Sequence, residues 1–294
     1  MTGQAGATTL RSVINGLEGR FRTAGVVSAR SDAEWLLAAS LGLTRTGLYL
    51  REDPLDVQSL ERVEALAQRR LAGEPLQYLL GDTQFLGLRF KVSPDVLIPR
   101  PETEVLAERA IRDLRARAHT SSTPLRALDV GTGSANLAIS LAHAVPTCVV
   151  VALELSWDAL RVARENVEAH HVGERVHLIQ ADWTSGVRGP VDVLLSKPPY
   201  VPGEAARWSA QHGSREPLMS RDGGTTGMAF HHRLIADAPR LLVLGGAMGL
   251  ECAEDQALPL ADLLTRTPWV RRVEIFEDLA GRPRGVWIER AWTH

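Results

Sequence analysis

The sequence predicts an α/β protein built on a seven-stranded, mostly parallel sheet, preceded by a small helical bundle and a connecting β-hairpin. Up to about residue 73 the apolar residues recur with a helical period. The segment 84–96 then alternates apolar and polar residues between prolines, which is typical of a short hairpin. From Leu106 onward, short apolar runs alternate with helical stretches, which is the pattern of an α/β sheet.

Composition and charge exclude several classes of protein. The chain has 294 residues, of which 45% are hydrophobic and 23% charged, so a folded core is expected and global disorder is excluded. The net charge of −2 provides no field that would recruit nucleic acid, so no direct nucleic-acid partner is expected. Neither an export signal nor a membrane span is indicated, and we expect a cytoplasmic protein.

Metal and disulfide chemistry are not expected. The two cysteines, Cys148 and Cys252, cannot build a disulfide framework and do not have the spacing of metal ligands. The pair His231 and His232 has no Cys, His or Asp partner at metal spacing. The sequence therefore predicts no metal site.

The N-terminal region contains repeated helical stripes. Ser31 and Glu34 have the spacing of a capping box and predict a helix start at that point. The apolar stripes on either side are Leu10, Val13, Ile14, Leu17 and Phe21, and Leu60, Val63, Ala67 and Leu71. We therefore expect a helical domain over residues 1–82, a hairpin linker over 83–100 and an α/β domain over 101–294.

Seven apolar runs predict the strands of the sheet. Ser156 is placed to cap the helix after the second run, and helices between the early runs imply right-handed parallel crossovers. The last two runs are joined only by DLAGRP, which indicates an antiparallel hairpin at one edge. The predicted strands are 125–130, 148–154, 175–180, 191–195, 241–251, 270–277 and 284–290.

A glycine-rich turn follows the first of these strands, in ALDVGTGSANLAISLA. Gly131 and Gly133 allow the backbone to approach a ligand closely, and Asp129 lies two residues before the first glycine. Glu154 ends the second strand, where an acidic side chain accepts hydrogen bonds from ribose hydroxyls. The turn amides suit a carboxylate and Asp129 an amino group, so an amino acid joined to a nucleoside fits the site. A purely structural turn is the alternative.

Asn136 decides against a pyrophosphate cofactor. The dinucleotide fingerprint requires Gly or Ala three positions after the second glycine, where this chain has Asn136. Asn136 itself is either a cofactor-loop residue or a polar group at a helix start. The segment DVGTGS, with Thr132 between its glycines, resembles the first motif of the class I S-adenosylmethionine methyltransferases. That resemblance implies S-adenosylmethionine as cofactor.

By the same resemblance Glu154 would hold the ribose, and Asp182 and Trp183 would flank the adenine. A helix cap and a packed aromatic ring are the alternatives for the last two.

The fourth strand ends in Lys197-Pro198-Pro199-Tyr200, at the edge where α/β sheets place their ligands. The two prolines fix the backbone, remove two N–H donors and leave carbonyl acceptors, and Tyr200 can stack on a planar group. A planar nitrogen-containing substrate suits these residues. An ordinary rigid turn is the alternative interpretation.

Taken together, the motifs resemble those of the HemK/PrmC family, protein-(glutamine) methyltransferases that modify the GGQ motif of peptide-chain release factors. The resemblance covers most of the chain and rests on GEPLQYLLG, VLIPRPETE, DVGTGS, PPY, REPLMSRDGGTTG, LGGAMGLE and EDLAGRPR. It implies a role in translation termination, a release-factor-binding N-terminal domain and a methyltransferase catalytic domain. We expect a monomer. Pro198, Pro199, Tyr200, Arg100 and Glu216 are the expected substrate-binding residues.

Lys197 is the main departure from the family pattern, whose signature begins with Asn. The family is thought to use the Asn oxygen and a proline carbonyl to accept both hydrogens of the substrate amide. Charged lysine has three donors and no acceptor, and it places a positive charge near the sulfonium unless its pKa is lowered. We therefore expect impaired methyl transfer, with Lys197, Pro198 and Tyr200 as the catalytic residues and Lys197 also touching the cofactor. Ala135, where the family usually has Gly, is expected to be a mild change.

Three other functions remain as alternatives. A non-catalytic homologue would retain the cofactor and release-factor surfaces without turnover. Methylation of exocyclic amino groups on DNA bases is opposed by the charge and by the lack of a target-recognition domain. Nicotinamide-dependent oxidoreduction is opposed by Asn136.

Overall fold

The computed structural model describes residues 9–50 and 54–292. The chain forms two compact units, residues 1–82 and 83–294. Within the described ranges, no helix combines the length and the apolar character that crossing a membrane requires.

The first unit is a helical bundle. Thr9 caps the first helix by accepting a hydrogen bond from the Ser12 N–H at 3.2 Å, and Asp56 caps the fourth by accepting from Ser59 at 2.6 Å. The predicted apolar stripe of the first helix faces the core, and Phe21 is fully buried. The helices are α1 (Leu10–Thr23), α2 (Ala29–Leu41), α3 (Arg45–Tyr49), α4 (Val57–Leu71) and α5 (Leu76–Leu80).

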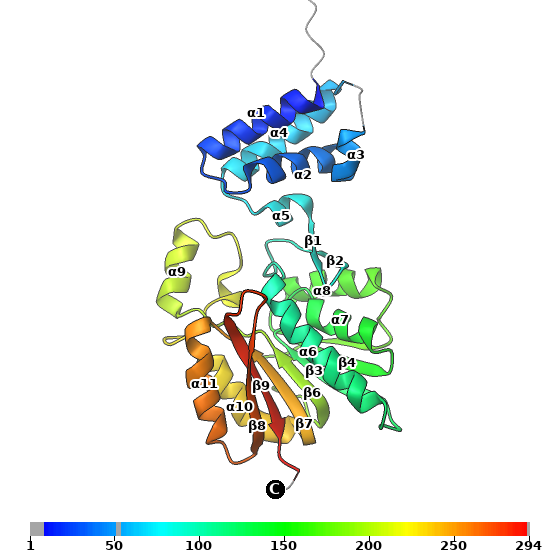
Figure 1. Ribbon diagram of the computed structural model, residues 1–294, viewed down its shortest axis with the longest axis vertical. Helices are drawn as coiled ribbons and strands as arrows, with labels where there is room; N and C mark the ends of the chain where they lie inside the picture. Colours follow the sequence, from blue (N-terminus) through cyan, green and yellow to red (C-terminus); the bar gives the residue numbers. More distant parts are fainter. Residues whose placement is uncertain (1–8, 51–53, 293–294) are drawn as a thin grey trace, which may run out of the picture. The chain divides into compact units, whose positions relative to one another are not determined.

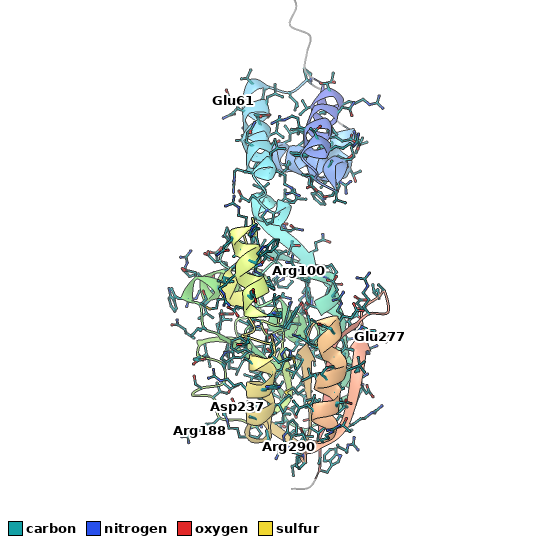
Figure 2. The ribbon with its side chains drawn as sticks, turned by 90° about the vertical axis from the view of Figure 1, so that its left-hand side faces the viewer. Glu61, Arg100, Arg188, Asp237, Glu277 and Arg290 are labelled. Atoms are coloured by element: carbon teal, nitrogen blue, oxygen red, sulfur yellow. The ribbon has the colours of Figure 1, made fainter. Side chains whose placement is uncertain are left out.

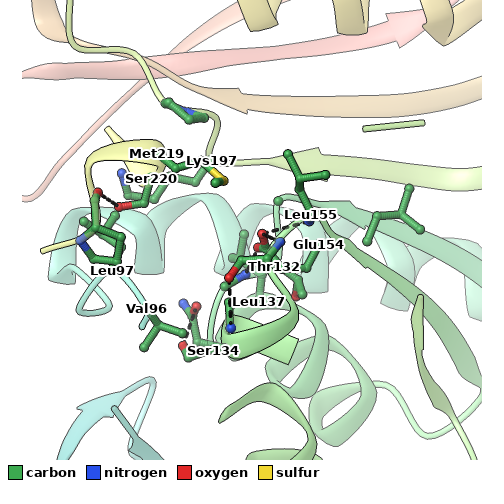
Figure 3. Close-up of a pocket in the computed structure, with 18 of the residues that line it drawn as sticks. Val96, Leu97, Thr132, Ser134, Leu137, Glu154, Leu155, Lys197, Met219 and Ser220 are labelled. Atoms are coloured by element: carbon green, nitrogen blue, oxygen red, sulfur yellow. Dashed lines mark hydrogen bonds between the residues drawn. The ribbon is translucent and has the colours of Figure 1, made fainter. Parts of the chain in front are cut away.

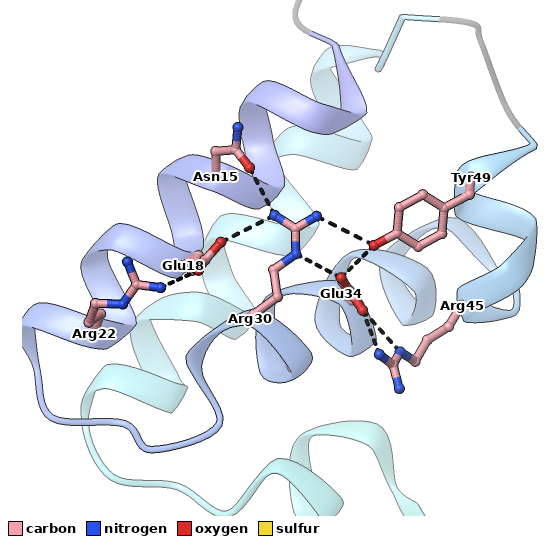
Figure 4. Close-up of polar contacts among 7 residues, drawn as sticks. All are labelled: Asn15, Glu18, Arg22, Arg30, Glu34, Arg45 and Tyr49. Carbon is pink, nitrogen blue, oxygen red and sulfur yellow. Dashed lines mark hydrogen bonds and ion pairs between the residues drawn. The ribbon is translucent and has the colours of Figure 1, made fainter.

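The capping box predicted at Ser31 and Glu34 is wrong. Helix α2 begins at Ala29, so Ser31 lies inside it, and the buried Glu34 side chain bonds sideways to neighbouring groups (Figure 4). Its carboxylate accepts hydrogen bonds from Arg30 at 2.8 Å and Arg45 at 2.6 Å, and from the hydroxyl of Tyr49. The Glu34 carboxylate therefore binds Arg30 of the same helix and Arg45 and Tyr49 of α3, and not the backbone N–H groups at the helix start. A local sequence pattern cannot show the contacts with α3.

The second unit contains a seven-stranded sheet in the order β5-β4-β3-β6-β7-β9-β8. Strands β3 to β7 pair in parallel, and β9 pairs antiparallel with both β7 and β8. The predicted strands and the antiparallel hairpin at the edge are confirmed. The strands are β3 (Leu125–Val130), β4 (Cys148–Glu154), β5 (Val176–Gln180), β6 (Val191–Ser196), β7 (Leu242–Glu251), β8 (Val270–Glu277) and β9 (Pro283–Arg290).

Helices cover both faces of this sheet (Figure 1). Helices α6, α7 and α8 pack on one face with one apolar core, and α10 and α11 pack on the other face with a second core. Ser156 caps α8 as predicted, by accepting a hydrogen bond from the Ala159 N–H at 3.2 Å. The helices are α6 (Pro101–Ala118), α7 (Asn136–Ala144), α8 (Trp157–Ala169), α9 (Gly203–Gln211), α10 (Ala229–Leu241) and α11 (Ala257–Thr265), with short 3₁₀ turns η1 (Leu218–Ser220) and η2 (Glu254–Gln256).

The two-stranded hairpin of β1 (Asp82–Phe85) and β2 (Leu88–Lys91) is anchored in the second unit. Phe85 and Phe90 are fully buried in its core, with their rings edge to face at 6.2 Å. The amide of Asn166 on α8 bonds to both the N–H and the carbonyl of Lys91, at 2.7 and 3.0 Å. The hairpin packs into the core of the second unit, because both of its phenylalanines are buried there.

From β3 the chain continues to β4 and β5 on one side of the sheet, and then returns to β6 and β7 on the other side. The topological switch point of the sheet therefore lies between β3 and β6. Ligands of open α/β sheets bind at such a point, beyond the carboxyl ends of the strands. Figure 2 shows Arg100 at this end of the second unit and Arg290, the last residue of the antiparallel β9, at the other end.

Candidate functional site

The glycine turn between β3 and α7 has the backbone conformation that the sequence predicts. Gly131 and Gly133 have φ of +75° and +56°, and a side chain built on either would meet no atom within 4 Å, so both face open space. Ala135 also has a positive φ, of +63°, and is fully buried. Its replacement of glycine is therefore not mild, because an L-residue in this region is strained by roughly 1–2 kcal/mol.

Glu154, at the end of β4, is fixed by backbone donors. Its Oε2 accepts the Gly133 N–H at 2.9 Å, and its Oε1 accepts the N–H groups of Leu155 and Ser156 at 2.9 and 3.0 Å. Since a carboxylate oxygen has two lone pairs, Oε2 retains capacity for a further donor. The carboxylate is therefore held in place and can still accept a ribose hydroxyl.

Asp129 lies beneath the turn and is not among the residues that line the pocket. It is fully buried, and its Oδ2 accepts the hydroxyl hydrogen of Thr132 at 2.6 Å. Its other oxygen has no hydrogen-bond partner within the part of the chain that the structure describes. Burial raises the pKa of Asp129 to about 7. The structure thus shows Asp129 shaping the turn through Thr132, whereas the expected contact with a cofactor amino group remains a prediction.

Two stacked aromatic side chains form part of the pocket wall. Trp183 stacks on Phe230 with ring centroids 4.2 Å apart, and both line the pocket. Asp182 instead is 58% exposed and forms an ion pair with Arg233 at 3.0 Å. Of the two residues expected beside an adenine, the structure brings only Trp183 to the pocket, and sequence analysis missed Phe230.

The rim after β6 combines a cation with a rigid backbone. Lys197 and Pro199 line the pocket, while Pro198 is buried. The Nζ of Lys197 lies 3.0 Å from Oε1 of Glu251, 3.3 Å from the hydroxyl of Tyr200 and 4.4 Å from the centroid of its ring. The ammonium of Lys197 therefore lies over one face of the Tyr200 ring. The sequence had predicted a ring free to stack on a planar group, without this contact.

Lys197 is charged. Its side chain is only 15% exposed, and burial by itself lowers the pKa of an amine. The neighbouring Glu251 carboxylate outweighs this effect, with a contribution from Tyr200, and raises the pKa of Lys197 above its ordinary value. The pKa of Lys197 is thus not lowered, and the amine does not become a neutral group with a free lone pair.

Arg100 and Glu216 bind each other. One Nη of Arg100 donates to both carboxylate oxygens of Glu216, at 2.7 and 2.6 Å, and Glu216 also accepts the Ile98 N–H at 3.2 Å. Both residues were expected to bind substrate. The structure places them in an ion pair that joins the segment 95–99 to the 217–220 turn, because each supplies the counter-charge that the other needs.

These elements enclose one pocket (Figure 3). Lys197 and Met219 lie across it from Val96 and Ser134, and Asn136 lines it at the start of α7. The residues present fit a nucleoside, with Glu154 for a ribose and an aromatic wall for a base. The N–H groups of the two turn glycines already have acceptors, since Gly131 donates to the carbonyl of Leu153 at 2.9 Å and Gly133 donates to Glu154, so a cofactor carboxylate at the turn amides stays a prediction. The lining includes Gly131, Thr132, Gly133, Glu154, Leu155, Trp183, Lys197, Pro199, Pro217, Met219 and Phe230.

His231 on α10 bonds to the backbone of β7. His231 is fully buried and its Nε2 lies 2.8 Å from the carbonyl oxygen of Glu251, and burial lowers its pKa. Across residues 9–50 and 54–292, no three His, Cys, Asp or Glu side chains come together as metal ligands.

Known proteins match both units. Residues 12–81 match the family described as PrmC N-terminal domain, and residues 114–213 match the methyltransferase small domain. A release factor glutamine methyltransferase of Bradyrhizobium diazoefficiens is 36% identical over 97% of this chain and 95% of its own length. One of Chlorobaculum tepidum is 39% identical over 87% of this chain and 89% of its own length. The chain belongs to the release factor glutamine methyltransferase family.

Family membership makes this chain a methyltransferase, and its cofactor is S-adenosylmethionine, which the pocket fits. The fold agrees: the crystal structure of the hMettl16 catalytic domain has a TM-score of 0.56, at 17% identity over 78% of this chain and 82% of that one. Besides Phe230, sequence analysis missed Glu251, which forms the ion pair with Lys197. The available signal was an acidic residue ending the strand that follows β6 in the sheet.

Proposed function

We propose that this methyltransferase transfers a methyl group to the side-chain amide nitrogen of the glutamine in the GGQ motif of peptide-chain release factors. One observation carries the proposal: the proline-stiffened rim at Lys197 and Pro199 opens on the same pocket as the glycine turn and Glu154. A planar carboxamide at this rim would lie beside the methyl donor. The names of the relatives at 36% and 39% identity support this substrate.

The task of the rim is to orient a weak nucleophile. The lone pair of a carboxamide nitrogen is delocalised into its carbonyl, so rate enhancement comes from positioning and from acceptors for the amide hydrogens. When bound, S-adenosylmethionine supplies a methyl group activated by its sulfonium. The pocket residues Glu154 and Trp183 would hold that cofactor. The rim at Lys197 and Pro199 would present the amide nitrogen to its methyl carbon, with the demethylated product as leaving group and water as the acceptor of the proton.

Lys197 makes this copy slow in our proposal. A charged lysine offers no lone pair, so the carbonyl of Pro198 remains as an acceptor without the side-chain oxygen that the family signature provides. By analogy with loss of one oxyanion-hole donor, the rate should fall roughly a hundred- to a thousandfold. Pro198, Pro199 and Tyr200 keep the roles in substrate binding that the resemblance implies.

The test is mass spectrometry of the tryptic peptide that contains the GGQ glutamine, after incubation of a release factor with this chain and S-adenosylmethionine. One added methyl group on that glutamine supports the proposal. An unmodified peptide at long times and high enzyme concentration supports the second candidate, a non-catalytic homologue that binds cofactor and release factor. The lysine without acceptor capacity is the observation that favours this second candidate.

The finer assignments belong to the same proposal. The helical unit, residues 1–82, would dock the release factor, which is consistent with the match of residues 12–81 to the PrmC N-terminal domain. We propose a cytoplasmic monomer that makes no direct contact with nucleic acid, in keeping with a net charge of −2.

A further inference from the structure

Lys197, the residue directly after β6, and Glu251, the last residue of β7, occupy neighbouring positions at the carboxyl ends of adjacent parallel strands. The register of β6 and β7 pairs Ser196 with Leu250, so the residues that follow them stand beside each other at the carboxyl edge. Their side chains meet, with Nζ of Lys197 3.0 Å from Oε1 of Glu251. Only Lys197 lines the pocket, and Glu251 lies behind it.

Glu251 is buried at the end of β7, and both its side chain and its carbonyl have close polar neighbours. Its side chain is 3% exposed, and its carbonyl oxygen lies 2.8 Å from Nε2 of the fully buried His231. Within the described ranges its one ion pair is with Lys197, and its Oε2 has no hydrogen-bond partner. An ionised carboxylate in such a place requires a nearby cation, and Lys197 provides it.

The same pair matters to the methyl donor. A cation in the wall of the pocket repels a sulfonium, and in a partly dehydrated site this repulsion is far less screened than in water. The carboxylate 3.0 Å from the ammonium cancels most of that field. The relevant comparison is between S-adenosylmethionine and its demethylated product, which share every group except the charged sulfur and its methyl.

We propose that Glu251 is a positioning residue of the methyl-transfer rim: it holds the side chain at position 197 and neutralises the charge that Lys197 brings beside the methyl donor. The inference rests on the proposed function for the placement of the sulfonium next to the rim. A carboxylate only accepts hydrogen bonds, so with asparagine at position 197 Glu251 would bind the amide N–H and leave the amide oxygen for the substrate.

Calorimetric titration with S-adenosylmethionine and with S-adenosylhomocysteine tests this without turnover. In Glu251→Gln, Lys197 loses its counter-ion, and the affinity ratio should shift against S-adenosylmethionine by about tenfold. In Lys197→Met the cation is removed while the Glu251 carboxylate keeps the Tyr200 hydroxyl as a donor at 3.3 Å, and the ratio should shift about tenfold toward S-adenosylmethionine. The double variant should return to within about threefold of the native ratio, because both charges are then absent.

A matched control is Glu165→Gln, which breaks the chain's other lysine–carboxylate pair, between Lys91 and Glu165, with side chains 55% and 47% exposed. It should leave the ratio unchanged. Native ratios in both single variants would overturn the inference. If circular dichroism shows Glu251→Gln to be unfolded, Lys197→Met decides alone, since its expected shift has the opposite sign. A shifted ratio in a chain that methylates no release factor would separate this inference from the proposed function.

Discussion

The guanidinium of Arg100 lies 2.7 and 2.6 Å from the two carboxylate oxygens of Glu216, so one ion pair connects the start of α6 to the loop after α9. The residues on either side of this pair, 95–99 and 217–220, supply two walls of the cofactor pocket. Glu216 is 10% exposed and also accepts the Ile98 N–H. The pair therefore connects two segments that line the pocket.

Glu216→Gln should weaken S-adenosylmethionine binding by about tenfold, mainly through faster dissociation, because a neutral amide holds Arg100 less strongly than a carboxylate does. Stopped-flow displacement measures the dissociation rate. The control is Asp158→Asn, which breaks the exposed Arg161–Asp158 pair on α8, with side chains 61% and 60% exposed. Equal dissociation rates in Glu216→Gln and the native chain would contradict this account.

Lys197→Asn should raise the rate of glutamine methylation by roughly a hundred- to a thousandfold, because it restores an acceptor oxygen and removes a cation from the rim. Mass spectrometry of the GGQ peptide at short times measures the rate. Lys91→Asn, a change at the only other lysine of the chain, is the matched control and should have no effect. Equal rates for the native chain and Lys197→Asn would show that lysine is tolerated at this position.

Glu154→Gln should lower the affinity for both S-adenosylmethionine and S-adenosylhomocysteine, by about tenfold or more. The ribose is common to both ligands, and the amide replaces one acceptor that also fixes the Gly133 N–H at 2.9 Å. Calorimetry with both ligands checks this. Unchanged affinities for both ligands would argue against a ribose contact.

Asp129→Asn should change the pH dependence of stability. The pKa of Asp129 is raised to about 7, so the folded chain binds this proton more tightly than the unfolded chain does. Native stability therefore falls as pH rises from about 4 to 7, and the ionised carboxylate is buried at higher pH. Over this pH range the free energy of unfolding of the neutral variant should rise relative to that of the native chain, by up to about 4 kcal/mol. Urea denaturation at pH 5 and pH 8 measures the difference, and equal differences at both would refute the assignment.

Glu34→Gln should destabilise the helical unit by about 3 kcal/mol, since Arg30 and Arg45 would lose their buried acceptor. Burial raises the pKa of Glu34, but hydrogen bonds from Tyr49, Arg45 and Arg30 outweigh this and lower it to about 2. The stabilisation is present above pH 4.5 and is lost as pH falls toward 2.

Hydrogen exchange of α2 peptides localises the effect, and Glu61→Gln, on the exposed side of α4 (Figure 2), should leave that exchange unchanged. Equal protection of α2 in Glu34→Gln and the native chain would count against the network.

Local patterns were sufficient for much of this molecule. Alternation of strands and helices predicted the seven strands, since burial on both faces of a parallel sheet demands continuous apolar runs. The turn at Gly131 and Gly133 was predictable because only glycine adopts such a conformation without strain. The capping box at Ser31 failed, since contacts from Arg45 and Tyr49 engage Glu34 from outside its helix.

By itself, the sequence determined the sheet, the cofactor turn and the presence of lysine at position 197, because backbone conformation and burial follow the nearest residues. Only the tertiary structure decided what surrounds that lysine. Glu251 is 54 positions away along the chain and reaches Lys197 through the register of two strands. Likewise Arg100 and Glu216 became partners because the fold brings two loops to one pocket mouth. The energy of an ion pair depends on the distance between the two charged groups in space, and the number of residues between them in the sequence does not give that distance.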